Sequence, residues 1–393
     1  MWQTVSLGDV CTISSSKRIF AKEYQTEGIP FYRGKEVIEK HNGNSVSTEL
    51  FISPERYEEI KSKFPVPKKG DILLTSVGTL GISWLVDEEE FYFKDGNLTW
   101  LRCNAKILSG YLYLWLNSAE AQNQIDAKCI GSTQKALTIE TLNKFQITLP
   151  SLGVQEKIVS LVKPIESRIN NNRKINENLE QQAQAIFSNE FLTLETLPDG
   201  WKQASLIDIA DYLNGLAMQK YRPTADESGI PVLKIKELRQ GCCDDNSELC
   251  SPNIKSDYII HDGDIIFSWS GSLLVDFWCG GICGLNQHLF KVTSNKYDKW
   301  FYYAWTKHHL DRFIAVAADK ATTMGHIKRD ELSKAEVFIP NEADYNRIGA
   351  MLQPIYDLII ANRIENQKLA ETRDTLLPKL MSGEIDISEV DYE

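Results

Sequence analysis

The sequence has no run of 18 or more apolar residues, no CxxC pair and none of the common nucleotide-binding motifs. Without a long apolar run, no segment is predicted to cross a membrane as a helix. The first ten residues, MWQTVSLGDV, contain neither a charged start nor an apolar stretch, which argues against secretion. We therefore expect a cytoplasmic protein. Its 393 residues are too many for one ordinary core and predict two domains, with or without a connector.

The eight cysteines are scattered along the chain, and His288 lies near the densest part. The closest groups are Cys242-Cys243-x6-Cys250 and Cys279-x3-Cys283. One interpretation is a zinc site that includes His288. The favoured interpretation, because no CxxC pair occurs, is a set of reduced thiols in a reducing cytosol. We predict no metal and no cofactor in this chain.

Motifs that would indicate catalysis are missing. There is no GxxxxGK[ST] phosphate loop, no GxGxxG after a strand, and no Asn/Asp-Pro-Pro-aromatic tetrapeptide of the kind that holds an extruded adenine. His308 and His309 could bind a metal, but no carboxylate at helical spacing completes a site, and packing on an aromatic helix is favoured. No triad or dyad stands out. The sequence therefore predicts no catalytic residue and a non-catalytic part of a larger system.

The net charge of −11 is unevenly distributed. Residues 1–150 carry 17 Lys and Arg against 18 Asp and Glu, whereas residues 341–393 carry 5 against 11. Two nearly neutral domains can still present a basic face to phosphates. The acidic total therefore does not exclude a nucleic-acid partner.

An internal repeat organises the chain. GIPFYRGKEV (28–37) parallels GIPVLKIKEL (229–238), and KKGDILLTSVGTLG (68–81) parallels HDGDIIFSWSGSLL (261–274). The phrase NNRKINENLE (171–180) returns as ANRIENQKLA (361–370). The offset drifts within the first 150 residues of each copy and then stays at 190. Two copies of a two-part unit are predicted, one part variable and the other constant in length.

The constant part is predicted to be a long helix in each copy. From Ile158 and from Ile348 the apolar residues recur at close to 3.5-residue spacing, which is typical of two helices that pair as a coiled coil. Pro164 and Pro354 predict a kink or a restart near the start of each helix. The roughly 25 residues beyond each proline would form a rod of about 38 Å. Residues shared by the two copies of the repeated phrase are predicted to fix register and partner docking: Asn172, Arg173, Asn176, Leu179, Asn362, Arg363, Asn366 and Leu369.

The variable parts are predicted to be mixed α and β. Short apolar runs such as 71–76 and 264–267 have strand length, and residues 110–125 and 297–314 have helical length. Each Gly-Asp-Ile strand is followed by small hydroxyl residues and glycines, which can approach a phosphate closely. A polar loop with Lys, Gln, Arg or His precedes each long helix, at 131–135 and 322–329. Such side chains read base edges or grip phosphates.

These features together resemble the specificity subunit of Type I restriction-modification systems, over essentially the whole chain. The resemblance is carried by the GDI-strand-Gly/Ser segments, the TQKALT loop (133–138), LP-x4-QEKI (149–158) and LLPKLMSGEIDI (376–387). In the second copy Met324-Gly325-His326 replaces Gln-Lys-Ala, and Tyr345 stands where Gln155 stands. We interpret this difference as altered DNA specificity or a local packing change, and not as loss of function.

The resemblance implies an α+β fold with two target-recognition domains in tandem. Each domain is followed by a long helix, and the two helices pair as an antiparallel coiled coil about a pseudo-twofold axis. The implied boundaries are 1–150 for domain 1, 151–196 for the first spacer helix, 197–340 for domain 2 and 341–393 for the second spacer helix. Each domain would read one half of a bipartite duplex DNA target.

The same resemblance implies the partners. Two methyltransferase subunits that use S-adenosylmethionine and a restriction and translocation subunit that uses ATP and Mg²⁺ would supply the chemistry. Two alternatives stay open. A protein-interaction scaffold would also suit the acidic total, and a stand-alone DNA-modifying enzyme is opposed by the missing motifs.

The predicted DNA contacts follow from the loops. In the first copy they are Lys17, Arg18, Arg33, Lys35, Ser76, Thr79, Asn97, Thr133, Gln134 and Lys135. In the second copy they are Lys220, Arg222, Lys234, Lys236, Ser268, Ser270, Ser272, Asn286, Gln287, Thr322, Thr323, His326, Lys328 and Arg329.

Overall fold

The structure, a computed structural model, describes residues 2–128, 136–319 and 329–387. The chain divides into two compact units. Unit 1 comprises Met1–Lys174 and Leu369–Glu393, and unit 2 comprises Ile175–Lys368. Each unit therefore contains one globular domain, the end of one long helix and the beginning of the other. Along the described part of the chain, no helix is both long and apolar enough to span a bilayer.

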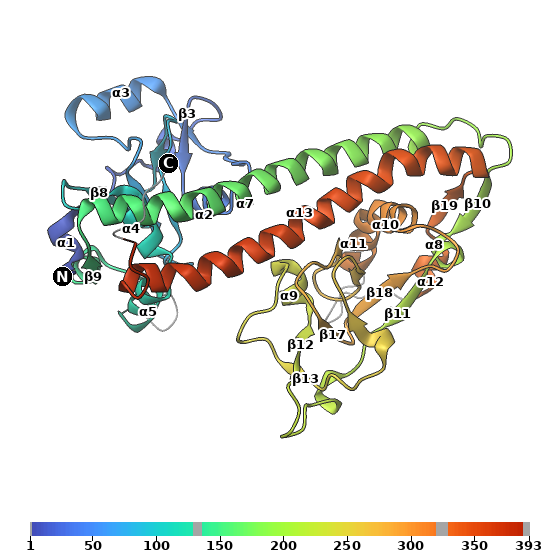
Figure 1. Cartoon of the computed structure of the whole chain (residues 1–393). Helices are drawn as coiled ribbons and strands as arrows, with labels where there is room; N and C mark the ends of the chain where they lie inside the picture. Colours follow the sequence, from blue (N-terminus) through green and yellow to red (C-terminus); the bar gives the residue numbers. More distant parts are fainter. Residues whose placement is uncertain (1, 129–135, 320–328, 388–393) are drawn as a thin grey trace. The chain divides into compact units, whose positions relative to one another are not determined.

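The described residues of unit 1 contain nine strands, six complete helices and the first part of a seventh, long helix (Figure 1). The strands are β1 (Gln3–Ser6), β2 (Cys11–Ser14), β3 (Ile29–Tyr32), β4 (Phe51–Ile52), β5 (Ile72–Thr75), β6 (Ser83–Leu85), β7 (Tyr92–Phe93), β8 (Leu98–Cys103) and β9 (Gln146–Leu149). The helices are α1 (Leu7–Val10), α2 (Gly34–His41), α3 (Pro54–Lys63), α4 (Ser109–Leu116), α5 (Ala119–Lys128), α6 (Ile139–Asn143) and α7 (Leu152–Phe187), which continues into unit 2.

Unit 2 repeats this plan with one more strand among its described residues. The strands are β10 (Lys202–Ser205), β11 (Asp211–Asn214), β12 (Ile230–Leu233), β13 (Leu249–Cys250), β14 (Ile259–Ile260), β15 (Ile265–Ser268), β16 (Leu274–Phe277), β17 (Cys283–Leu285), β18 (Leu289–Thr293) and β19 (Glu336–Ile339). The helices are α8 (Leu206–Ile209), α9 (Ile235–Gln240), α10 (Lys299–His308), α11 (Leu310–Asp319), α12 (Arg329–Ser333) and α13 (Glu342–Ser382), which continues into unit 1.

Strand order makes the repeat explicit. Unit 1 has an antiparallel sheet β2-β8-β5-β6, and unit 2 has β11-β18-β15-β16 in the same order. The register also matches, because β5 begins opposite Leu101 of β8 and β15 begins opposite Val292 of β18. In each unit the first and last strands pair antiparallel, β1 with β9 and β10 with β19, and close the domain just before its long helix. Strand β14 has no counterpart in unit 1, where helix α3 lies in the corresponding part of the chain.

The core of each unit is completed by residues from the other copy of the repeat. In unit 1, Leu377 and Met381 of α13 are buried in one cluster with Ile158 of α7 and the domain residue Tyr111. In unit 2, Ala183 and Phe187 of α7 and Phe191, just beyond its end, are buried in one cluster with Ile348 and Leu352 of α13. Burial of this kind contributes about 1.5–3 kcal/mol for each large apolar side chain. Neither core is complete without both helices.

Both long helices run through their prolines. Pro164 lies inside α7 and Pro354 lies inside α13, so the predicted restart at these positions is wrong. Proline removes one backbone hydrogen bond and crowds the preceding turn. Val162 in unit 1 and Leu352 in unit 2, each two residues before the proline, are buried and keep the helices packed across those turns.

The aromatic segment of unit 2 is broken where one helix was predicted. Helix α10 ends at His308, and α11 starts at Leu310. His309 lies between them, almost fully buried, with its Nε2 2.8 Å from the carbonyl oxygen of Glu336. Its ring is stacked on Trp305 at 6.1 Å. The packing interpretation of the two histidines therefore fits the structure, and no group of three metal-ligating side chains occurs among residues 2–128, 136–319 and 329–387.

The burial of His309 predicts a pH dependence of stability. Burial, more than any neighbouring charge, lowers the pKa of His309 to about 4, whereas an unfolded histidine titrates near 6.5. Between these values the unfolded chain binds a proton that the folded chain does not, so stability falls as pH drops from about 6.5 to 4. The loss is on the order of 3 kcal/mol at most. We expect His309→Gln to remove this component in denaturant titrations across that range, whereas the exposed-site control His261→Gln keeps it. Equal pH profiles for H309Q and the unchanged protein would contradict the assignment.

Candidate nucleic-acid interface

Polar side chains from three separate segments of unit 2 line one open hollow of about 370 Å³. Lys234 and Lys236 come from the start of α9, and Asn286 and Gln287 come from the turn between β17 and β18. These four residues were predicted as DNA contacts. The structure brings them together although they are 50 positions apart in the chain.

The start of α9 is fixed by a buried carboxylate. Lys234 is the N-cap residue, and its backbone N–H donates to Oε2 of Glu237 at 3.2 Å. Glu237 is only 3% exposed, and its Oε1 accepts from the hydroxyl of Ser247 at 3.1 Å. A glutamate that reaches back from the third helical position to the N-cap is half of a capping box. The arrangement holds both lysines at the rim of the hollow.

The basic side chains of this surface are paired with exposed carboxylates. Glu248 lies 2.7 Å from the Nζ of Lys234 and 3.1 Å from the guanidinium of Arg222. Hydrogen bonding from Lys234, with a smaller contribution from Arg222, lowers the pKa of Glu248. Asp244 pairs with Lys236 at 3.0 Å. A phosphate that binds here has to replace these carboxylates, which an exposed ion pair resists only weakly.

The serine-rich loop after β15 is mostly occupied with its own contacts. Ser268 is buried, and its hydroxyl donates to the carbonyl of Ser272 at 2.9 Å. The Ser272 hydroxyl accepts from Arg239 at 3.2 Å. Ser270 lies 3.2 Å from Nδ1 of His288, which lines the hollow. The loop therefore positions His288 at this surface.

Lys220 and Arg329 lie outside the hollow. Lys220 is exposed at the end of a short 3₁₀ turn, next in the chain to Gln219, which does line the hollow. Arg329, at the start of α12, donates to the carbonyl of Tyr212 at 2.9 Å. In the structure this guanidinium is bonded to the domain itself.

Unit 1 carries a similar start to its helix α2. Arg33 is the N-cap residue, and its backbone N–H donates to Oε2 of Glu36 at 2.7 Å. The Arg33 guanidinium also donates to Oε1 of the same carboxylate at 2.8 Å. Burial raises the pKa of the fully buried Glu36, but the hydrogen bonds from Arg33 outweigh it and leave that pKa lowered. Lys35 lies two residues after Arg33, and its ammonium group is 3.8 Å from Glu39, one turn further along α2.

Other predicted contacts of unit 1 lie around the end of β5. The backbone N–H of Ser76 donates to the carbonyl of Asn97 at 2.9 Å, and the side chain of Ser76 is buried. Thr79 is exposed in the turn that follows. Arg18 pairs with Asp95 at 2.8 Å.

Lys17 completes the set of described contacts in unit 1. Its ammonium group lies 4.2 Å from the centre of the Phe64 ring, an arrangement that favours a cation over the ring face. Its backbone N–H donates to the hydroxyl of Tyr92 at 2.8 Å.

The polar loops that precede the long helices lie outside the described residues. This applies to Thr133, Gln134, Lys135, Thr322, Thr323, His326 and Lys328. The chain that follows the first of these loops is described. Ala136 pairs with Val77, and the N–H of Leu137 donates to the carbonyl of Ser76 at 2.9 Å. Residues 136–137 are thus anchored at the end of β5.

The repeated helical phrase supplies polar contacts in unit 2. Nδ2 of Asn362 donates to Oδ1 of Asn176 at 2.8 Å, and Nδ2 of Asn176 donates to the carbonyl of Ile359 at 3.2 Å. Both side chains are buried, and Leu179 packs against the core beside them. Residue 176 meets residue 362, and residue 190 meets residue 347, so the two chain segments run antiparallel in unit 2.

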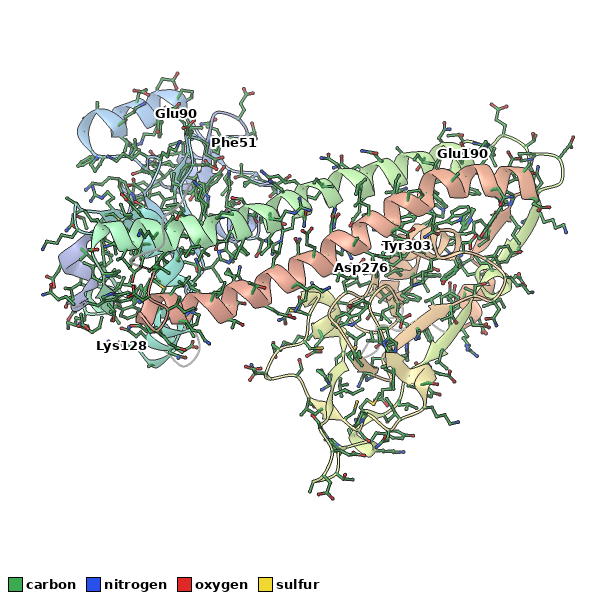
Figure 2. All side chains as sticks on the ribbon, viewed as in Figure 1. Phe51, Glu90, Lys128, Glu190, Asp276 and Tyr303 are labelled. Carbon is green, nitrogen blue, oxygen red and sulfur yellow. The ribbon has the colours of Figure 1, made fainter. Side chains whose placement is uncertain are left out.

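Arg363 ties the two helices to the domain of unit 2. Its guanidinium donates to Asp276 of β16 at 2.6 Å and to Glu180 of α7 at 2.8 Å. Asp276 and Tyr303 lie beside α13 (Figure 2). Burial lowers the pKa of Arg363, but Asp276 and Glu180 more than offset it and leave the pKa raised.

The matching residues of the phrase differ in environment. Arg173, in unit 1, donates to the carbonyl of Asn42 at 2.7 Å. Asn172 is buried, and Leu369 and Asn366 are partly buried.

Two further polar residues that line the hollow in unit 2 were not among the predicted DNA contacts. Gln219 and His288 line it, but the first stands in a turn with no motif and the second was considered only as a zinc ligand. The position of His288 directly after Asn286 and Gln287 was the available signal.

The fold defines a class of protein in which two similar α+β domains alternate with two long helices. Comparison with known proteins identifies the family. The family model described as Type I restriction modification DNA specificity domain matches residues 1–181 and 198–371, and the chain belongs to that family. The two matched stretches correspond to the two copies of the repeat.

Individual relatives agree with this assignment. The chain is 25% identical over 425 residues to the Type I restriction enzyme MjaIX specificity subunit of Methanocaldococcus jannaschii, covering 99% of this chain and 94% of the relative. It is 20% identical to the HindI specificity subunit of Haemophilus influenzae, covering 81% and 87%. The S subunit structure from M. genitalium has a TM-score of 0.59 at 15% identity, covering 97% of this chain and 96% of that one, and so shares the fold.

The buried asparagine pair predicts a measurable coupling between the helices. Asn362→Ala removes a donor and leaves the buried Oδ1 of Asn176 without it, so unfolding free energy should fall by about 1–2 kcal/mol. Asn346→Ala, on an exposed position of the same helix, should change it by less than about 0.5 kcal/mol. Urea titrations compare the two. A loss in N362A no larger than in N346A would show that the pair does not matter.

Proposed function

We propose that this chain is the DNA sequence-specificity subunit of a Type I restriction-modification complex, with each domain contacting one half of a bipartite duplex target. The observation that carries the proposal is a local arrangement at a helix start that occurs in both domains. In both domains a basic N-cap residue, Arg33 or Lys234, is set by a buried glutamate three residues on.

The proposed contacts are of two kinds. Lysines and arginines at the rim supply the phosphate contacts that dominate affinity without reading sequence. Amide and imidazole side chains, such as Asn286, Gln287 and His288 at the hollow of unit 2, are suited to base edges. The separation of the two kinds within one surface supports recognition rather than general DNA affinity.

The partners complete the proposal. The paired helices dock two methyltransferase subunits, and restriction and translocation subunits join the same complex. S-adenosylmethionine, ATP and Mg²⁺ act in those subunits, and this chain is itself non-catalytic. The family assignment and the full-length similarity to specificity subunits support this division of labour.

Duplex binding tests the proposal against a protein scaffold. Affinity for DNA that contains the target should fall steeply as salt rises from 50 to 200 mM, by a factor set by the number of phosphates contacted. Fluorescence anisotropy measures this on the complex with its methyltransferase subunits. Binding that does not respond to salt would favour the scaffold.

Two variants at the hollow should act in opposite directions. Lys234→Ala removes a phosphate contact, so affinity should fall for all sequences and the salt slope should drop by about one. Glu248→Gln removes the carboxylate that competes for Lys234 and Arg222, so affinity should rise severalfold. Lys202→Ala, on the exposed edge strand β10, is the charge-matched control. If K234A and K202A weaken binding equally, the hollow is not the interface.

A further inference from the structure

Unit 1 contains an open cavity beside α7. In unit 2, side-chain contacts fill the equivalent place. Two adjoining hollows of about 580 and 230 Å³ share His41, Tyr113, Glu166 and Asn170. Together they lie between the end of α2, the face of α4 and one side of α7. Their combined size is that of a small-molecule site.

One stripe of α7 supplies the polar wall. Lys163, Glu166, Asn170, Arg173 and Lys174 follow one another at intervals of three, four, three and one residues. Residues three and four apart share a helix face, so these side chains point the same way. Arg373 of α13 faces the same hollow.

The charge of the lining is strongly positive. Five Lys and Arg side chains line the two hollows, against the carboxylates of Asp87 and Glu166. Asp87 lies 3.8 Å from the ammonium group of Lys40. Burial, with a smaller contribution from Asp374, raises the pKa of Glu166 against the opposing effect of the charge on Arg373.

The charge of Arg373 acts on Arg173, which lines the same hollow. Partial burial of its guanidinium, and then the charge of Arg373, lower the pKa of Arg173. Like charges placed close together in one hollow are unfavourable unless an anion lies between them. The fork of donors on each guanidinium matches the oxygens of a phosphate.

Comparison with unit 2 shows what is missing in unit 1. In unit 2, Arg363 is neutralised by Asp276 and Glu180. Trp84 occupies in β6 the position that Asp276 has in β16, because these residues lie opposite Leu73 and Ile266 at matching positions of β5 and β15. At the offset of 190, Ala370 replaces Glu180, and Arg373 replaces Ala183.

The remaining space is also filled differently. In unit 2, Tyr356 packs edge-on against Tyr303 at 5.0 Å. At the same offset, unit 1 has the smaller pair Glu166 and Tyr113. Unit 1 thus has one more arginine, Arg373, which pairs with the neighbouring Asp374 at 2.8 Å. It has two fewer carboxylates beside the repeated arginine Arg173, and Glu166 in place of the second tyrosine ring of unit 2.

We propose that this cavity binds the phosphate group of a small organic phosphate between Arg173 and Arg373. The apolar wall formed by Leu114 and Val159 accommodates the body of the ligand. The site is separate from the DNA contacts assigned above and does not depend on them.

Phenyl phosphate, inorganic phosphate and phenol are the probes, and calorimetry on the DNA-free full-length chain measures binding. Phenyl phosphate should bind in a one-to-one ratio, inorganic phosphate several times more weakly, and phenol not at all. Arg373→Gln should weaken phenyl phosphate binding at least tenfold. Lys379→Gln, an exposed charge on the same helix, should leave it unchanged.

Ala370→Glu separates binding from folding. This substitution installs in unit 1 the carboxylate that neutralises the equivalent arginine of unit 2, so it should abolish phenyl phosphate binding while the thermal midpoint of the ligand-free protein is maintained or raised. Absence of binding to phenyl phosphate, or equal loss in R373Q and K379Q, overturns the proposal. The proposal is also overturned if A370E weakens the binding of duplex DNA as much as the binding of phenyl phosphate, because the cavity would then be part of the DNA-binding surface.

Discussion

Pairing of the two long helices is the constraint on which both units depend. Within unit 2, Asn176 and Asn362 fix the contact between antiparallel segments of α7 and α13, and Arg363 joins both to the sheet through Glu180 and Asp276. Within unit 1, Leu377 and Met381 of α13 enter the same core as Ile158 of α7. Because each core takes residues from both copies, a domain cut from its own half of the chain would lose part of its apolar interior. The repeated phrase in the sequence reflects this shared requirement.

The shared strand order of the two units explains how exposed residues can vary on a common fold. The strand order and the closing strand pairs are common to both units, whereas the loop after β5 begins with Ser76 and Val77 and the matching loop after β15 begins with Trp269 and Ser270. Buried glutamates at the start of α2 and α9 hold the basic N-cap residues in place. A rigid support of this kind allows the exposed residues to change without loss of the fold. The two units also differ at their helix-facing side, where unit 1 has an open basic cavity and unit 2 has closed ion pairs.

Sequence reasoning reached the architecture because its evidence was periodic and repeated. The 3.5-residue spacing predicts the paired helices, and the constant offset of 190 predicts two copies. It did not show that the helices pass through Pro164 and Pro354, because tertiary packing outweighs the local cost of proline. Nor did it show the break at His309, which depends on a hydrogen bond to Glu336 across the domain. Lys234, Lys236, Asn286 and Gln287 were found from residue type, but their meeting in one hollow depends on sheet topology. The burial of Ser76 and Ser268 could not be read from their position in Gly/Ser-rich loops.

The most direct test of the account is a methylation map of cellular DNA in cells that carry the complete system. The intact chain is compared with one in which residues 197–340 are replaced by the corresponding segment of a relative. The account predicts methylated adenines in a split motif, with one half changed by the replacement while the other half and the gap persist. A motif that survives the replacement unchanged, or one that changes in both halves, would contradict the assignment of one half-site to each domain.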